Sequence, residues 1–183
     1  MKNLAFLFIT LILSCLVFGQ NTVVVTGKIT DPNSDAVYLR GTSTGENGRP
    51  VMVELDSAAV DPENRFRLEA ELDSTTQVTF YDGLEVAQML LSPGDSIHLT
   101  LNTAAFDETI QFYGKGSEKN NAIAALMIFD EKNMIGVNSG LSSENIDTNV
   151  VFSQHEEATE AYVKLVKSYQ SEIPEFSNYG NQL

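Results

Sequence analysis

The stretch at positions 65–72 reads RFRLEAEL and has the clearest alternation in the chain. Apolar residues occupy every second position, and charged residues stand between them. The apolar set is Phe66, Leu68, Ala70 and Leu72, and the charged set is Arg65, Arg67, Glu69 and Glu71. Because successive side chains of a strand point to opposite faces, this stretch predicts a β-strand with one face on a core and one in water.

The same period of two extends outward in both directions, from position 22 to about position 114. Turn sequences rich in Pro, Gly, Asn and Asp interrupt it at short spacing. They lie at 31–34, 45–48, 61–64, 82–83 and 92–95. Segment 84–91 fits helix and strand templates equally, and its place between two turns favours a strand. Seven or eight short strands predict a mainly β fold, either an antiparallel β-sandwich or an open barrel.

Beyond Gly116 the apolar period changes to steps of three and four residues. A helix is predicted over 117–134, with Ser117 as its N-cap, and a polar loop over 136–148. A second helix is predicted over 150–173, so two α-helices follow the β domain. The expected division is a signal peptide over 1–19, an antiparallel β domain over 20–115 and a helical linker region over 116–183.

The composition limits the function. The 183 residues suffice for about one domain. Eleven basic against 25 acidic residues give a formal charge of -14, which argues against nucleic-acid binding because phosphate backbones repel such a chain. One cysteine and two histidines cannot supply an internal disulfide, a Cys-x-x-Cys redox pair or a thiolate metal cage.

Cys15, the single cysteine, belongs to a targeting segment. A positive start at Lys2 precedes an apolar run over 4–17, and Val17 and Gly19 place β-branched and small residues at the -3 and -1 positions of a cleavage site. This pattern is typical of a secretory signal peptide. We therefore expect cleavage after Gly19 and a protein in the periplasm or cell envelope.

The same segment has a second interpretation. Its sequence Ile-Leu-Ser-Cys at 12–15 resembles a bacterial lipobox, in which Cys15 is lipidated and becomes the first residue. The apolar run continues past Cys15, where lipoproteins usually turn polar, which favours ordinary cleavage. A retained anchor is the third alternative. Membrane contact is expected only through a lipid anchor at Cys15.

Two patterns could carry catalysis or bind a cofactor, and each has a simpler explanation. Gly114, Lys115 and Gly116 precede a predicted helix but lack the spacing of a phosphate-binding loop, so a strand-to-helix turn is the better interpretation. His98 lies on the outer face of a predicted strand and His155 at the start of the last helix, with no nucleophile motif beside either. We expect no catalytic and no cofactor-binding residue.

Two acidic patterns could hold a cation. Asp31, Asn33 and Asp35 alternate like the start of a calcium loop, but the glycine and glutamate needed at its sixth and twelfth positions are missing. A solvated turn is therefore expected, with a weak extracellular calcium site as the alternative. The glutamates at the start of the second helix match its dipole, and they are Glu156, Glu157 and Glu160. We expect no metal site.

The segment 90–121 reads LLSPGDSIHLTLNTAAFDETIQFYGKGSEKNN and joins a Pro-Gly-Asp turn, a Gly-x-Gly turn and Glu-x-Asn-Asn at a helix start. This arrangement resembles the N-terminal domain of unknown function DUF4369 in Bacteroidetes-type TlpA/ResA-like thiol:disulfide oxidoreductases, of the thioredoxin-like AhpC/TSA group. The first strand, Val-Thr-Gly-Lys-Ile at 25–29, fits the same domain. The resemblance covers roughly 22–179.

Family members typically continue into a thioredoxin-like domain with Cys-x-x-Cys, and this sequence stops at Leu183 without one. No catalytic residue is therefore carried over, and the chain is expected not to be an enzyme. The resemblance implies a non-catalytic envelope module that binds a thioredoxin-like reductase or another envelope protein. One alternative is the N-terminal part of a truncated thiol:disulfide oxidoreductase, and a second is a carrier with a small ligand inside the β domain.

Overall fold

The computed structural model describes the backbone of residues 21–141 and 148–177 and, within these ranges, the side chains of 21–133, 153 and 156–177. Its strands are β1 (Thr22–Thr30), β2 (Ala36–Thr44), β3 (Pro50–Ala59), β4 (Arg65–Glu71), β5 (Thr76–Tyr81), β6 (Val86–Leu91), β7 (Ser96–Asn102) and β8 (Gln111–Lys115). Its helical elements are η1 (Thr103–Ala105), α2 (Phe106–Thr109), α3 (Ser117–Leu141), α4 (Thr148–Glu172) and η2 (Pro174–Phe176). The predicted leader, with Cys15 and Gly19, lies outside the described residues.

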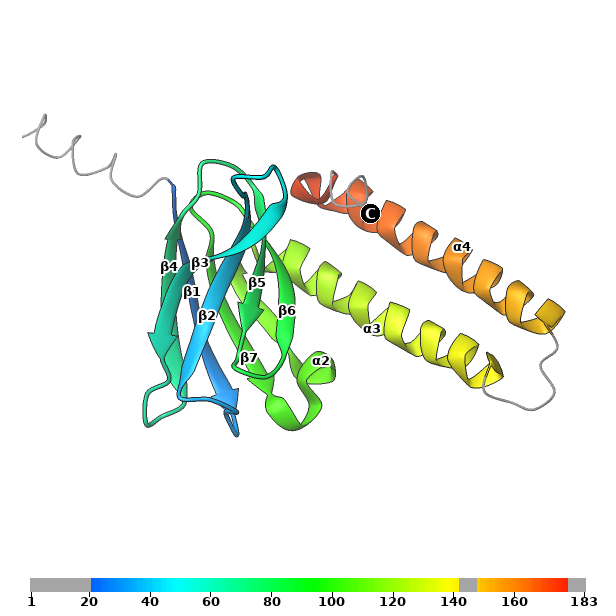
Figure 1. Ribbon diagram of the computed structural model, residues 1–183, viewed down its shortest axis with the longest axis horizontal. Coiled ribbons are helices and arrows are strands. Elements are labelled where there is room, and N and C mark those ends of the chain that lie inside the picture. The colour runs from blue at the N-terminus through cyan, green and yellow to red at the C-terminus, as the bar shows by residue number, and fades with distance from the viewer. Residues whose placement is uncertain (1–20, 142–147, 178–183) are drawn as a thin grey trace, which may run out of the picture.

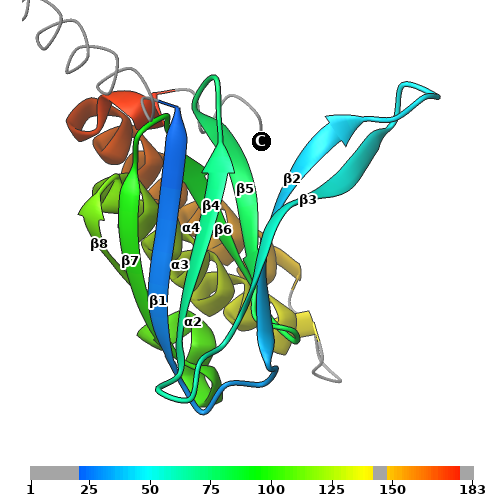
Figure 2. The ribbon, with the colours of Figure 1, turned by 90° about the vertical axis from the view of Figure 1, so that its left-hand side faces the viewer.

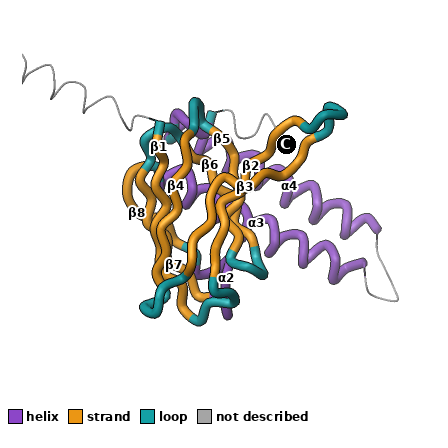
Figure 3. The backbone as a smooth tube through the Cα atoms, turned by 60° about the vertical axis from the view of Figure 1, so that its left-hand side comes forward, coloured by secondary structure: helices purple, strands orange, loops and turns teal. Residues whose placement is uncertain are grey.

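The strands form two four-stranded sheets, and the helices gather on one side of them (Figure 1 and Figure 3). The first sheet has the order β4-β1-β7-β8 and the second sheet the order β3-β2-β5-β6. The chain changes sheets at the β1–β2, β3–β4, β4–β5 and β6–β7 connections. The sheets are open and do not close into a barrel. The predicted mainly β fold followed by two helices is therefore confirmed, as a sandwich.

One strand pair departs from the predicted antiparallel arrangement. β1 is antiparallel to β4 but parallel to β7, with Val25 opposite Ile97 and Ile29 opposite Leu101. β7 enters the first sheet from β6 of the second sheet and so arrives beside β1 in the same direction. The side-chain period of a strand does not depend on the direction of its neighbour, so the sequence pattern could not reveal this pair.

The apolar positions of the strands meet between the two sheets. Phe66 of β4 stacks on Phe80 of β5 with ring centres 5.3 Å apart, and both rings are buried. A Cβ at Gly27 would lie 2.5 Å from the Phe66 ring, so this glycine makes the close packing feasible. Further fully buried core side chains are Ile29, Leu39, Leu68, Met89, Ile97 and Leu99. Side chains thus fill the space between the sheets.

α3 and α4 form a helical hairpin that projects beyond the sandwich (Figure 1). α3 packs on the edge strands β6 and β8, and α4 packs on α3. Ile123 and Leu126 of α3, Val166 of α4 and Phe176 of η2 form a small apolar cluster there with Leu90 of β6, which also contains Ala122 and Ile173. The hairpin therefore has an apolar cluster of its own and rests on one side of the sandwich.

The loop predicted over 136–148 is wrong at its start, because α3 continues to Leu141. A glycine inside a helix costs only about 1 kcal/mol, so Gly136 does not end α3 by itself. The second predicted helix corresponds to α4, which begins two residues earlier, at Thr148. Positions 142–147 of the predicted loop lie outside the described residues.

Candidate functional site

The outer face of the second sheet carries a cluster of three side chains at its centre, an arginine and two tyrosine rings tilted by 35° to each other. Tyr38 and Arg40 come from β2, where Leu39 between them points into the core, and Tyr81 stands opposite Tyr38 on β5. The guanidinium carbon of Arg40 lies 4.2 Å from the ring centre of Tyr81 and 5.2 Å from that of Tyr38. The two ring centres are 5.9 Å apart. We call Tyr38, Arg40 and Tyr81 the tyrosine–arginine platform.

The platform positions a cation and leaves its donors available. The guanidinium carbon lies over both rings, and this cation–π contact does not require any of its N–H donors. Among the described side chains, no ion pair and no hydrogen bond engages the guanidinium of Arg40. Glu54 stands opposite Arg40 in the β2–β3 register without forming an ion pair with it. The Tyr81 hydroxyl donates to the carbonyl of Gly83 at 2.6 Å, which holds its ring in place.

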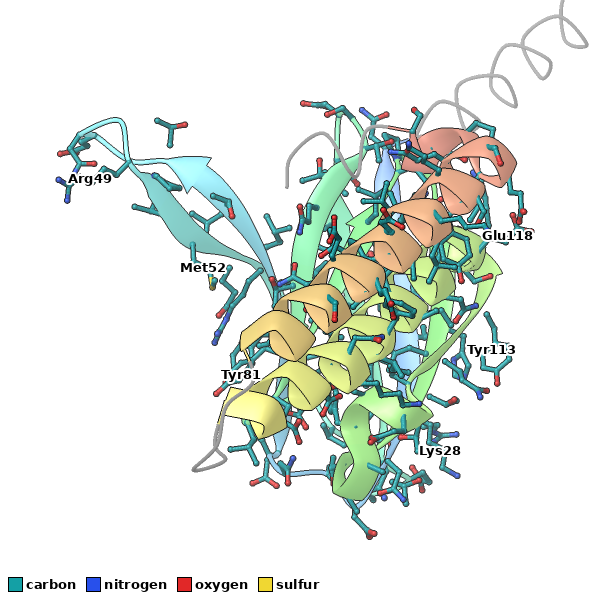
Figure 4. The ribbon with its side chains drawn as sticks, turned by 90° about the vertical axis from the view of Figure 1, so that its right-hand side faces the viewer. Lys28, Arg49, Met52, Tyr81, Tyr113 and Glu118 are labelled. Carbon is teal, nitrogen blue, oxygen red and sulfur yellow. The ribbon has the colours of Figure 1, made fainter. Side chains whose placement is uncertain are left out.

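Exposed apolar side chains surround the platform. Val86 stands opposite Tyr81 on β6, Leu84 in the preceding turn is 69% exposed, and Met52 on β3 is 64% exposed. Figure 4 shows Met52 and Tyr81 on the same side of the molecule. Of the six large apolar side chains that are exposed in the described residues, four belong to the second sheet or its turn: Val51, Met52, Leu84 and Val86. Such a concentration is typical of a binding surface.

A two-stranded ribbon borders the platform on one side. β5 pairs with β2 only over 38–40, so residues 41–44 pair with β3 alone and extend away from the sandwich (Figure 2). The ribbon turns at Gly48, which has a φ of 74° and donates to the carbonyl of Gly45 at 2.9 Å. Its two edges have no strand partner among the described residues. An isolated two-stranded hairpin is only marginally stable in water, so the part of the ribbon beyond β5 depends on its continuity with the sandwich.

The helical hairpin borders the second sheet on the β6 side, and a buried ion pair attaches it. The Lys119 ammonium lies 2.7 Å from the Asp95 carboxylate and donates to the Ser92 hydroxyl at 2.7 Å. The two charged side chains are only 3% and 4% exposed. Gly116, with a φ of 91°, lets α3 start against Asp95, because a Cβ there would lie 2.5 Å from the carboxylate. The pair fixes the place of the helix start.

Two consecutive asparagines attach α3 to one edge strand of each sheet. The side chain of Asn120 accepts from Leu90 N at 2.8 Å and donates to Leu90 O at 3.0 Å, on the edge of β6. Asn121 does the same with Phe112 of β8, at 2.9 and 2.8 Å. Each asparagine replaces a missing strand neighbour. We call Asp95, Lys119, Asn120 and Asn121 the helix anchor, and it holds the hairpin against the β6 edge of the second sheet and the β8 edge of the first.

The outer face of the first sheet has paired charges instead. Arg65 lies 3.1 Å from Asp61 and 3.0 Å from Glu63, and Arg67 donates to Glu69 at 2.8 Å. The backbone N–H of Arg65 is the main cause that lowers the pKa of Asp61 below 3.8; burial opposes the shift and the Arg65 guanidinium adds to it. These exposed pairs leave neither arginine available as an anchor for another molecule.

His98 lies on the outer face of the first sheet, as predicted. Its Nδ1 is 3.1 Å from the hydroxyl of Thr26, and its ring centre is 6.5 Å from that of Tyr113. This accounts for an exposed strand histidine by one hydrogen bond and one ring neighbour. The side chain of His155 lies outside the described residues. That neither histidine is catalytic stays a prediction.

The other sequence candidates lie apart from the platform. Gly114 and Gly116 have φ values of 89° and 91°, which agrees with the strand-to-helix turn, and Lys115 donates to the carbonyl of Gly94 at 2.9 Å. Asn33 donates to Asp82 at 3.0 Å. The glutamates Glu156, Glu157 and Glu160 are exposed on α4. Within the described ranges, no three side chains of His, Cys, Asp or Glu gather as metal ligands would.

The sequence reasoning missed the platform. Tyr38 and Arg40 are two positions apart in one strand, and this spacing is a usable signal, because two such residues share a face. Tyr81 comes from a strand more than forty residues away, and only the β2–β5 pairing brings it to Arg40. The three residues could therefore not be joined from the sequence.

No protein-family model and no curated protein matches the chain. Among solved structures, the chain is similar to a candidate cell adhesion protein from Bacteroides ovatus ATCC 8483, at 10% sequence identity and a TM-score of 0.29. The similarity covers 51% of this chain and 42% of the other, so the chain spans less than half the length of that protein. A likeness of this degree carries no argument about function. Of the described helices, none has the length and hydrophobicity for a membrane crossing.

Proposed function

We propose that the chain is a non-catalytic binding module of the cell envelope and that it recognises a partner protein with the outer face of the second sheet. One observation carries the proposal. The exposed apolar residues Met52, Leu84 and Val86 concentrate around the tyrosine–arginine platform, whereas the first sheet presents paired charges. An open, partly apolar face suits a protein partner better than a small molecule, because small-molecule sites are concave.

The location rests on the leader at 1–19, with Gly19 before the cleavage site or Cys15 as the lipidated residue. The partner class rests on the resemblance to the DUF4369-type domain, and it is a thioredoxin-like reductase or another envelope protein. The helix anchor supports this role, since it fixes the hairpin at one border of the recognition face. Neither conclusion draws on the adhesion protein.

The proposal of a non-catalytic role is supported by what the polar groups do. The buried ions Lys119 and Asp95 form an ion pair, and the buried side-chain amide of Asn120 forms two hydrogen bonds with the backbone of Leu90. The described residues contain no buried side-chain N or O atom without a partner. Groups engaged in this way hold the fold together and are not poised for chemistry.

The alternatives fare differently. A small-ligand carrier would need space inside the sandwich. That space is filled by one cluster of buried side chains, which includes Phe66, Leu68, Phe80 and Leu99. We therefore drop the carrier. The truncated thiol:disulfide oxidoreductase stays an alternative, and the DNA downstream of the Leu183 codon tests it: an in-frame or frameshifted thioredoxin domain with Cys-x-x-Cys would favour it.

The test of the proposed function compares the two outer faces. The chain from Gln20 is immobilised as wild type, as Met52→Ser/Val86→Ser, and as Tyr113→Ser, which removes an exposed aromatic from the first sheet. Purified thioredoxin-like reductases of the same envelope are then tested for binding by biolayer interferometry. We expect one to bind the wild type and Tyr113→Ser and to lose at least tenfold in affinity with the double variant.

Equal binding to all three chains would contradict recognition by the second sheet. An insulin-reduction assay with dithiothreitol tests the other half of the proposal. We expect no activity above the uncatalysed rate, because a chain from Gln20 has no cysteine. Clear activity would contradict a non-catalytic role.

A further inference from the structure

We infer that Arg40 is the anchor of a carboxylate-binding site and that its ligand is an acidic peptide segment of the partner protein. This inference rests on the proposed function, and it names the chemistry that the second sheet recognises. Three features carry it: the position of the guanidinium, its available donors and the apolar surroundings.

The guanidinium of Arg40 is held in place before any ligand arrives. It lies 4.2 Å from the ring centre of Tyr81 and 5.2 Å from that of Tyr38, and the Tyr81 hydroxyl is itself fixed by the Gly83 carbonyl. A free arginine side chain loses much rotamer freedom when it binds a ligand. Here the two rings have already restricted it, so less entropy is lost on binding.

The donors of Arg40 are unengaged within the described part of the chain, in contrast to those of Arg65 and Arg67. A planar guanidinium with unengaged N–H groups matches the two oxygens of a carboxylate in a bidentate arrangement. The complementary charge is therefore negative. The formal charge of -14 repels every anionic ligand at long range, so a segment with a single carboxylate suits Arg40 better than a phosphorylated or polyanionic surface.

The surroundings strengthen such a contact and indicate a peptide. Val86 and Met52 flank the platform and would shed water when covered, which raises the strength of the ion pair at the centre. Arg40 is partly exposed between the exposed Val86 and Met52, so a segment of chain can lie across this face with an acidic side chain on Arg40 and apolar side chains on Val86 and Met52. A small free carboxylate would gain only the central contact.

Glu54 makes the inference sharper. It stands opposite Arg40 in the β2–β3 register, so its carboxylate competes with a ligand there. Its negative charge lowers the affinity of an acidic segment without blocking the donors. Replacing it by the isosteric glutamine removes the repulsion and leaves the platform intact, so a variant with increased affinity is available as a test.

The experiment uses a defined probe. A capped, fluorescein-labelled octapeptide of valine and serine with one central glutamate is titrated with the chain from Gln20 at 0.15 M NaCl, and the matched control peptide has glutamine in place of that glutamate. Fluorescence anisotropy gives the affinities, and the Arg40 side-chain N–H resonances are followed by NMR. We expect the acidic peptide to bind about tenfold more tightly than the control peptide.

Four variants locate the site. Arg40→Gln should abolish the preference for the acidic peptide, and Arg40→Lys should retain only part of it, because lysine cannot form the fork. Glu54→Gln should bind the acidic peptide several-fold more tightly, and Arg67→Gln on the first sheet should not change the affinity. Equal binding of the two peptides, full affinity in Arg40→Lys, or an equal loss in Arg67→Gln would overturn the inference.

The two proposals fail separately. If a reductase binds the second sheet but Arg40→Gln leaves its affinity unchanged, the proposed function stands and the carboxylate site falls. If the acidic peptide binds through Arg40 but the double variant Met52→Ser/Val86→Ser still binds every protein partner, the carboxylate site stands and the proposed function fails. Circular dichroism and the Tm of each variant verify that it is folded.

Discussion

The outer faces of the two sheets have the same alternating sequence pattern but different surfaces. On the first sheet, Arg65 and Arg67 pair with nearby carboxylates, and the face is open to water. On the second sheet, α3 covers Leu90 at the β6 edge, and beyond it Arg40 rests on two tyrosine rings with exposed apolar neighbours. Polar residues at the outward positions of a strand thus predict that the face is exposed, but they do not predict whether its charges are paired or available.

The contrast has a physical origin in the neighbours of each arginine. Asp61 and Glu63 lie in the turn just before Arg65, and Glu69 is two residues after Arg67, so the charges of the first sheet are neutralised locally along the chain. Arg40 has no acidic residue within four positions in the sequence. Its neighbours come from other strands, and no ion pair among the described side chains neutralises its charge.

The largest change to this contrast should come from breaking the helix anchor. Lys119→Ala leaves the Asp95 carboxylate buried at 4% exposure without its partner. We expect a loss of about 3–5 kcal/mol in the free energy of unfolding, which urea denaturation measures. The start of α3 would then be held less firmly to the β6 and β8 edges.

The control is Lys115→Ala. Its ammonium donates to the Gly94 carbonyl at 2.9 Å from an exposed position, so we expect a loss below about 1 kcal/mol. Equal losses in Lys119→Ala and Lys115→Ala would mean that the buried ion pair does not hold the helix to the sandwich.

The next largest loss in the free energy of unfolding is expected from the asparagines that bind the edge strands of the two sheets. Asn120→Ala leaves the N–H and C=O of Leu90 buried and unpaired, which should cost about 2–3 kcal/mol. Asn121→Ala removes the matching pair of bonds to Phe112, but Asn121 is exposed and water can replace it. We expect about 1 kcal/mol there, again from urea denaturation, and the reverse order would contradict the assignment of the buried edge to the second sheet.

The sequence predicted the elements well because their causes are local. In RFRLEAEL the alternation alone places Phe66 and Leu68 in the core and Arg67 in water, as β4 does. The Pro-Gly-Asp and Gly-x-Gly turns and the helix start after Gly116 also follow from local chemistry. Asn120 and Asn121 stood out in the same motif, although their partners, the edges of β6 and β8, did not.

Longer-range features escaped the sequence for a common reason. The parallel pairing of β1 with β7 and the meeting of Tyr81 with Arg40 depend on which strands become neighbours, and a period of two contains no such information. The extent of α3 past Gly136 depends on a balance of small terms, in which one glycine weighs little. The candidate site consists of pairings of this kind, which is why it had to be found in the structure.

A smaller effect compares the two arginines directly. Arg40→Gln removes a cation from two rings and should cost about 0.5–1 kcal/mol, whereas Arg67→Gln removes one exposed ion pair and should cost less than about 0.5 kcal/mol. A double-mutant cycle of Arg40→Gln with Tyr81→Leu, measured by thermal unfolding, isolates the stacking energy. A coupling energy of zero would mean that the rings do not hold the guanidinium, and the pre-positioned anchor would be lost with it.

The smallest effect concerns pH, and the two sheets should respond with opposite sign. Asp61, before β4 of the first sheet, has a lowered pKa through the Arg65 N–H, so it stabilises the fold above its unfolded value of 3.8 and this stabilisation disappears as the pH falls through its folded value. Glu85, in the β5–β6 turn of the second sheet, has a raised pKa, first through burial and then through Asp107, Asp82 and Glu108. Its charge destabilises the fold above its folded value, and this destabilisation disappears as the pH falls towards 4.5.

Two variants separate these responses in a series of Tm measurements from pH 3 to pH 7. Glu85→Gln should raise the Tm at pH 7 by about 1 °C and lose the advantage as the pH falls below 4.5, because the wild-type carboxyl is then protonated in both states. Asp61→Asn should lower the Tm at pH 7 and approach the wild type near pH 3. If both variants shifted the Tm in the same direction at pH 7, the carboxyl of the second sheet would have to be stabilised like that of the first, and the difference between the two faces would not extend to their turns.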